Sequence, residues 1–120
     1  MLEPQGIHLS SDDAFKALSN SRRRQVILML SRSQEPIPAK DLAREIAATE
    51  NQIDSNQVTG KQRSRVYIGL IHSHLGLLDD LGVIEFNDRT RLVTETDDTQ
   101  PLAHFIKLLR RSCNVARGDA

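Results

Sequence analysis

Apolar residues recur at helical spacing along most of this chain, and one such stretch is much longer than the others. Between residues 59 and 81 the apolar side chains fall in one wide arc of a helical projection, with mostly polar side chains opposite. We therefore expect a single amphipathic helix over 59–81 that ends at Gly82. Its first turns are basic and its last turn is acidic, the reverse of what the helix dipole favours. A helix start of this kind suits an anionic partner.

Shorter patterns predict the remaining elements. Ile37, between two prolines, predicts a short bridge strand. Residues 83–86 and 91–96 are rich in β-branched residues and flank a polar turn, which predicts a hairpin. The polar segment 49–59 is expected to be a loop or an extension of the helix before it. Further helices, marked by capping residues and apolar stripes, are expected at 11–18, 22–32, 39–48 and 99–112.

These elements predict a mainly α fold with a small β-hairpin. Their order is helix, helix, strand, helix, helix, hairpin, helix, in a single domain over residues 1–120 with its core in 10–96. Two helices followed by a hairpin are typical of a winged helix-turn-helix. In that fold the second helix enters the major groove of DNA, and the hairpin, or wing, contacts a phosphate or the minor groove.

Composition narrows the classes of protein. With 120 residues, 38% hydrophobic and 27% charged, the chain fits one soluble globular domain. Because the net charge is zero, any affinity for nucleic acid must depend on how the charges are distributed. A single cysteine, together with the lack of a membrane-spanning apolar run or a signal-like start, predicts a cytoplasmic protein.

No pattern points to catalysis. The chain has no glycine-rich phosphate loop, nucleophile elbow, metal-ligand cluster or obvious pair of catalytic acids. His72 and His74 face different sides of a helix and are poorly placed to share a metal, and His74 is expected to lie in the core. His104 and Cys113 have no third ligand near them in sequence. We therefore expect no enzyme activity, no metal site and no cofactor.

Three stretches resemble the ArsR-like winged helix family of transcriptional regulators. Residues 17–27 (ALSNSRRRQVI) resemble its opening segment, and residues 37–46 its scaffold helix. Residues 73–84 (SHLGLLDDLGVI) resemble the end of its recognition helix. The long insertion and the Arg-Val-Tyr lead-in are similar to an ArsR-like domain common in halophilic archaea. The resemblance spans roughly residues 15–96 and implies a homodimeric regulator that binds double-stranded DNA.

The chain also departs from that family. The turn between the two helices of the helix-turn-helix is normally short, whereas about ten polar residues separate them here. Pro38 stands where Ser or Thr usually caps the scaffold helix. The cysteine pairs of metal-sensing members are absent, which argues against a thiolate sensor and leaves the effector unknown.

Candidate DNA contacts lie on the expected recognition helix 59–81 and on the wing 83–96. On the helix, a groove-facing surface is favoured over a merely solvated one, with Gly69 and Gly76 allowing close approach. At the hairpin turn, a phosphate or minor-groove contact and simple solvation are equally supported. For the residues from 22 to 24, all arginines, surface ion pairs with acids such as Asp12 and Asp13 are favoured over contact with the DNA backbone. The candidate contacts are Lys61, Gln62, Arg63, Arg65, Ile68, His72, Arg89 and Arg91.

The last helix is expected to form the homodimer, although its apolar stripe would equally close the core of one chain. Two recognition helices of a dimer would read half-sites about 34–36 Å apart. The rival hypothesis is a winged helix that binds another protein, which zero net charge and the acidic pairs at 79–80 and 97–98 favour. The two hypotheses differ in salt dependence, because binding to DNA phosphates would weaken as the salt concentration rises. The candidate dimer residues are Phe15, Leu102, Phe105, Ile106 and Leu109.

Overall fold

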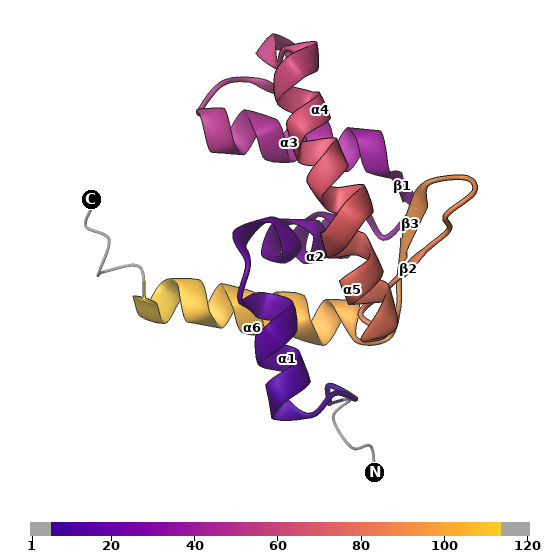
Figure 1. The fold of residues 1–120 in the computed structure, drawn as a ribbon. Helices are drawn as coiled ribbons and strands as arrows, with labels where there is room; N and C mark the ends of the chain where they lie inside the picture. Colours follow the sequence, from indigo (N-terminus) through magenta and orange to yellow (C-terminus); the bar gives the residue numbers. More distant parts are fainter. Residues whose placement is uncertain (1–5, 114–120) are drawn as a thin grey trace.

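The computed structural model describes residues 6–113, so the ends of the expected domain 1–120 lie outside it. The fold is mainly helical, with a small antiparallel sheet (Figure 1). No helix within this range is long and apolar enough to cross a membrane. The elements are α1 (Ser11–Leu18), α2 (Ser21–Ser33), β1 (Ile37–Pro38), α3 (Ala39–Asn51), η1 (Ser55–Gln57), α4 (Gly60–Gly69), η2 (Leu70–His74), α5 (Leu75–Asp80), β2 (Ile84–Phe86), β3 (Leu92–Glu95) and α6 (Thr99–Cys113).

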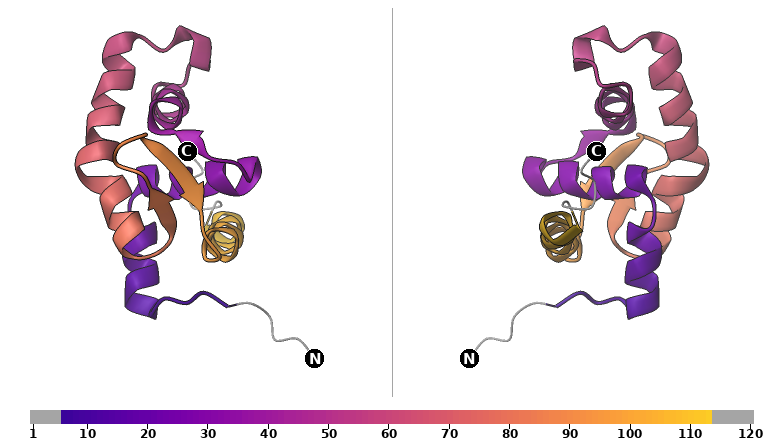
Figure 2. Two further views of the ribbon diagram at one scale, coloured as in Figure 1. Left: turned by 90° about the vertical axis from the view of Figure 1, so that its right-hand side faces the viewer. Right: turned by 90° about the vertical axis from the view of Figure 1, so that its left-hand side faces the viewer.

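The helices surround one aliphatic core. α2 packs against α6 and contacts α3, while α4 packs chiefly on α3. The sheet lies at one side of the helices, and α1 extends away from α2 at the opposite end from α3 and α4 (Figures 1 and 2). The largest fully buried side chains come from α2, α3, η2, α5, β2 and α6, which ties these helices and the sheet into one core: Val26, Ile27, Leu28, Leu30, Leu42, Ile46, Leu70, Leu75, Leu78, Ile84, Leu102 and Ile106.

The sheet has the strand order β1-β3-β2, with both pairs antiparallel. The expected bridge strand is confirmed, because Ile37 pairs with Val93 of the hairpin. Pro38 is tolerated at the edge of the sheet, where a missing N–H breaks no ladder. As expected, Pro38 gives α3 no side-chain cap. Instead, the N–H of Ala39 donates to the carbonyl oxygen of Arg91 at 2.9 Å, so the hairpin backbone supplies an acceptor for the first N–H group of α3.

Two predicted helix boundaries are confirmed in detail. The N–H of Asp13 donates to the hydroxyl of Ser10, which caps α1. Gly82 follows α5 with a φ of 79°. Its N–H donates to the carbonyl of Asp79, and the N–H of Val83 donates to that of Leu78. This pair of bonds is a Schellman motif, and it needs the left-handed conformation that glycine adopts without strain.

The expected uninterrupted α-helix over 59–81 is wrong in its middle. The segment stays helical from Gly60 to Asp80, but residues 70–74 form a wider π-helical turn. The buried positions are 66, 70, 75 and 78, so one interval is five residues long. A regular α-helix would rotate the fifth residue away from the core, and the π turn returns it. Before that region, α3 runs on to Asn51 and η1 follows, so 49–59 is only partly a loop.

Candidate functional site

The start of α4 is fixed by a reciprocal pair of hydrogen bonds. The N–H of Gln62 donates to the hydroxyl of Thr59 at 3.1 Å, and the N–H of Thr59 donates to Oε1 of Gln62 at 2.9 Å. This capping box satisfies two backbone donors at a solvent-exposed helix end. The carboxamide oxygen of Gln62 is thus used within the chain, so a contact of Gln62 with DNA would be made by its Nε2 donors. The pattern Thr-x-x-Gln was visible in the sequence.

The first turns of α4 stand clear of the core. Val66 is the only buried residue of this helix, which rests mainly on α3. Lys61, Arg63 and Arg65 are all exposed. None of the three forms an ion pair with any residue in 6–113. Because α4 itself contains no acid, these cations add to the positive end of its dipole.

One exposed stripe runs along α4 and into η2. Lys61, Arg65, Ile68 and His72 follow one another at intervals of four, three and four residues, which places them on the same side of a helix. All four are exposed, including Ile68 at 54%. Ile68 had fallen at the edge of the apolar arc, and the structure moves it outward because the core contacts are made by Val66 and Leu70. A branched apolar side chain therefore lies among three polar ones.

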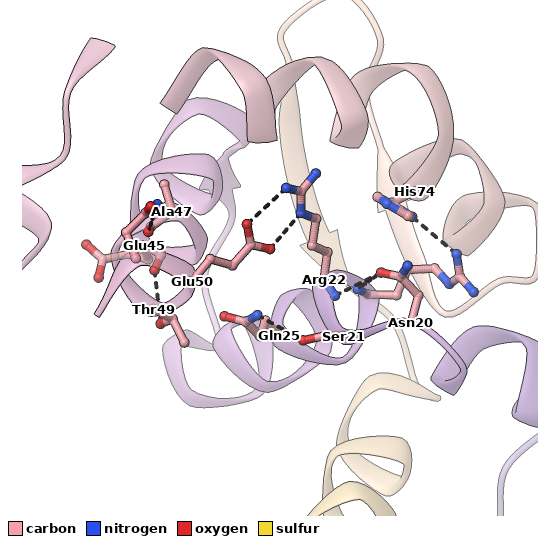
Figure 3. A network of polar contacts seen from close by, with 11 residues as sticks. Asn20, Ser21, Arg22, Gln25, Glu45, Ala47, Thr49, Glu50 and His74 are labelled. Carbon is pink, nitrogen blue, oxygen red and sulfur yellow. Dashed lines mark hydrogen bonds and ion pairs between the residues drawn. The ribbon is translucent and has the colours of Figure 1, made fainter. Parts of the chain in front are cut away.

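Gly69 does not belong to that stripe. An added Cβ at Gly69 would come within 2.9 Å of the Nη1 atom of Arg22, so the glycine faces α2. The guanidinium of Arg22 also forms two bonds with Glu50 at the end of α3, Nε to Oε2 at 2.7 Å and Nη2 to Oε1 at 2.9 Å (Figure 3). The Glu50 carboxylate raises the pKa of Arg22. Gly69 thus gives room to an arginine that links α2, α3 and α4.

Arg23 is a buried cation that holds the end of α1. Its Nη2 donates to the carbonyl of Lys16 at 2.8 Å, and its Nε donates to that of Ala17 at 3.2 Å. Its Nη1 donates to Nδ1 of His74 at 3.2 Å. Burial, followed by the charges of Arg23 and Arg22, lowers the pKa of His74. His74 is therefore the partly buried, hydrogen-bonded histidine that its place in the apolar arc predicted.

The expected ion pairing of residues 22–24 is confirmed for Arg22, which pairs with Glu50. Within residues 6–113 neither Asp12 nor Asp13 takes part in such a pair, and nor do the other two arginines. Arg24, like Arg23, donates to the end of α1, with Nη1 at 2.6 Å from the carbonyl of Leu18. Cations at a helix C-terminus satisfy carbonyls that have no partner inside the helix. The acids at positions 12 and 13 lie in the first turn of α1, at its other end. The sequence showed the charges, but not that α2 would fold back to bring them to this end.

The hairpin carries two cations in different states. Arg89 is exposed and forms no ion pair within residues 6–113, whereas Arg91 lies 3.2 Å from Asp88. Arg91 also has a φ of 62° in the left-handed region, where a side chain is strained. The Arg91 conformation lets its carbonyl reach the start of α3. Of the two expected wing contacts, Arg89 is the one that forms no ion pair within residues 6–113.

Two of the expected dimer residues belong to the core of the chain. Leu102 and Ile106 are 0% and 1% exposed on the side of α6 that faces α2, so the stripe closes this core, as one of the two readings expected. Phe15 and Leu109 remain exposed, as does Leu108, and Phe105 is half-buried. Apolar surface therefore remains on α1 and at the end of α6, where Leu108 and Leu109 are exposed instead of Leu102 and Ile106.

Other candidate groups are dispersed. Within residues 6–113 no cluster of three or more His, Cys, Asp or Glu side chains is close enough to hold a metal ion, and Cys113 is exposed. Asp98, expected on an acidic surface, is 6% exposed and accepts hydrogen bonds at 2.9 Å from the backbone N–H and from Nδ1 of His8. The acidic surface at 97–98 is thus reduced to Asp97.

Comparison with known proteins gives one match. A family model described as "Domain of unknown function (DUF7344)" matches residues 15–94, which covers the two-helix start, the basic helix and the hairpin. No curated protein and no solved structure matches the chain. The matched segment ends at residue 94, so α4 and nearly all of the hairpin lie within the family domain, whereas the whole of α6 lies outside it.

Proposed function

The chain belongs to the family described as Domain of unknown function (DUF7344), and we propose that it is a sequence-specific DNA-binding transcriptional regulator that acts as a homodimer. In this proposal the fold is a winged helix-turn-helix. α3 is the scaffold helix, α4 is the recognition helix in the major groove, and the β2–β3 hairpin is the wing. The ArsR-like segments at 17–27, 37–46 and 73–84 support the same assignment.

The observation that carries the proposal is the exposed start of α4. Lys61, Arg63 and Arg65 have no acidic partner in residues 6–113 and stand on a capped, projecting helix end. Such cations bind phosphates or guanine edges, while Ile68 is suited to apolar contact with a thymine methyl group. A helix of this diameter fits the major groove. Arg89 on the wing offers a second point of contact with the backbone.

A charge-matched pair of variants tests the recognition surface. Lys61→Ala/Arg65→Ala removes one lysine and one arginine four residues apart from α4. Lys107→Ala/Arg111→Ala removes the same two residue types at the same spacing from exposed positions on α6. The proteins then have equal net charge. We expect the α4 variant to lose at least tenfold in affinity for duplex DNA in a fluorescence anisotropy titration, and the α6 variant to keep most of it.

The salt dependence of the same titrations reports the mechanism. Each phosphate contact adds about one to the slope of log affinity against log salt, so the α4 variant should show a slope shallower by about two per half-site. Selection of a preferred site from random duplexes would identify the sequence. Equal affinities and equal slopes for the two variants would exclude α4 as the DNA-reading helix.

The proposed homodimer uses the apolar groups left exposed on α1 and α6. Phe15 is 61% exposed, and Leu108 and Leu109 are 41% and 38% exposed. Exposed apolar residues on α1 and α6 suit a two-fold interface, in which the same surface of each chain meets its copy on the other chain. Light scattering from the purified protein is expected to give twice the mass of one chain.

A protein-binding winged helix is the second candidate, and the exposure of Ile68 favours it. An apolar side chain surrounded by cations also suits an acidic partner protein with an apolar anchor. The two functions differ in what the purified chain does alone. Saturable binding to duplex DNA at low salt supports the regulator, whereas no binding to any duplex supports the protein-binding module.

A further inference from the structure

A groove of about 670 Å³ runs along the side of α2 that is flanked by α3 and α6. Its lining lies outside α4 and the β2–β3 hairpin, so it is distinct from the surface described above. The volume falls in the range of about 300–1,000 Å³ that is typical of small-molecule sites. The lining residues are Ser21, Arg24, Gln25, Leu28, Met29, Arg32, Ser33, Ile37, Glu45, Thr49 and Arg110.

The groove combines an apolar floor with cationic edges. Leu28 is buried, and Met29 and Ile37 are half-buried beside it. Three arginines line the groove against one glutamate, which gives it a formal charge of +2 in a chain whose net charge is zero. Arg32 and Arg110 form no ion pair within residues 6–113. Two of the three arginines are therefore not engaged in an ion pair within this range and lie beside apolar surface.

The packing of α2 against α6 brings two of these arginines to one end. Nε2 of Gln100 donates to the carbonyl of Ser31 at 2.9 Å, which joins the start of α6 to the end of α2. The two helices cross, and Figure 2 shows α6 nearly end-on with α2 lying across the view. Arg110 lines the groove together with Ser21 and with Arg24, which is one turn further along α2. The apolar floor then extends from this end towards Ile37.

Neighbouring polar groups complete that end. Nη1 of Arg24 donates to the carbonyl of Leu18, which fixes the side chain and leaves Nε and Nη2 as donors. Nε2 of Gln25 lies 3.4 Å from the hydroxyl of Ser21 (Figure 3). Because this guanidinium is already held in place, binding of a carboxylate or phosphate to it costs less side-chain entropy.

We propose that this groove binds a small organic anion with an apolar body. The carboxylate or phosphate group lies between Arg24 and Arg110, and the hydrocarbon part covers Leu28, Met29 and Ile37. Charge complementarity selects an anion, and the apolar floor selects one with a hydrocarbon body over inorganic phosphate. This site stands whether or not the chain binds DNA, because it shares no residue with the α4 surface.

Calorimetric titration of the intact protein with defined probes tests the proposal. Octanoate and octyl phosphate supply the anion and the hydrocarbon together. Octylammonium and octanol keep the hydrocarbon without the negative charge, and inorganic phosphate keeps the charge without the hydrocarbon. We expect saturable binding of the two amphiphilic anions, and affinities at least tenfold weaker for the three other probes.

Two adjacent arginines provide a matched pair of variants. Arg110→Gln alters a lining residue, whereas Arg111→Gln alters its exposed neighbour, which is not part of the lining. Because both side chains are exposed, neither change is expected to alter folding. We expect about a tenfold loss of octanoate affinity for Arg110→Gln and no loss for Arg111→Gln. Equal effects of the two variants, equal binding of octylammonium, or no saturable binding of either anion would overturn the proposal.

Discussion

Replacing Arg23 tests how the first two helices are joined to the π turn. In Arg23→Ala the carbonyls of Lys16 and Ala17, the hydroxyl of Ser19 and Nδ1 of His74 all lose a donor. The donor is a cation that is only 9% exposed and has no carboxylate partner in residues 6–113. Its removal therefore leaves several acceptors at the junction of α1, α2 and η2 without a partner.

The size of the loss follows from these contacts. A hydrogen bond to a charged group contributes about 1.5–3 kcal/mol, but bonds from one side chain are not additive, and water reaches the end of α1 after truncation. We expect the free energy of unfolding to fall by about 3 kcal/mol. With a slope of roughly 1.5 kcal/mol/M in urea for a chain of this size, the midpoint should fall by about 2 M.

Urea unfolding followed by circular dichroism gives the measurement, with Arg24→Ala as the control. Arg24 also donates to the end of α1, but through one bond and from a half-buried side chain, so its loss should cost about 1.5 kcal/mol. Arg23→Lys keeps the charge but not the planar fork, and should fall between the wild type and Arg23→Ala. Equal losses for Arg23→Ala and Arg24→Ala would refute the idea that Arg23 joins three elements.

Two further predictions concern pH and assembly. Burial, followed by the charges of Arg23 and Arg22, lowers the pKa of His74 from 6.5, and Glu50 acts the other way. The stability that neutral His74 contributes should therefore be fully present above about pH 6.5 and be lost as the pH falls through the lowered pKa of the folded state. His74→Asn keeps an acceptor for Arg23 and should remove that part of the pH dependence in urea titrations; an unchanged pH profile would contradict this. In the dimer, Phe15→Ser/Leu109→Ser should shift the mass measured by light scattering towards one chain, because burying each side chain contributes about 1.5–3 kcal/mol. An unchanged mass would place the interface elsewhere.

The local elements were largely determined by the sequence, because their signals are short-range. The serine pair 10–11 before an acidic first turn, the lone Ile37 between prolines, and Gly82 after a leucine-rich helix each predicted a boundary that the structure confirms, with Ser10 as the cap. Caps, turn residues and apolar periodicity act within a few residues of themselves. The overall class of a mainly helical fold with a small antiparallel sheet followed from their order.

The candidate surface was predictable only in part. The sequence located the cations at the start of α4, and the structure leaves them exposed. The sequence interpretation did not include the use of Gln62 in the capping box, or the contact of Gly69 with Arg22. Gln62 was missed although its signal, Thr-x-x-Gln, is local. Gly69 was missed because its neighbour is 47 positions away in the chain, and nothing near Gly69 in sequence indicates it.

Only the tertiary structure decided how α5 is rotated about the helix axis relative to α4. A period of 3.6 residues was assumed throughout, and it described the apolar arc well enough to find the helix. The core of α2 and α3, however, fixes Val66 and Leu70 on one side and Leu75 on the same side, which requires a π turn between them. Burying Leu70, Leu75 and Leu78 on one side, at about 1.5–3 kcal/mol for each side chain, stabilises the helix with this turn. Sequence periodicity therefore predicts that a helix forms, while the partners that it packs against decide which of its faces remains available to bind.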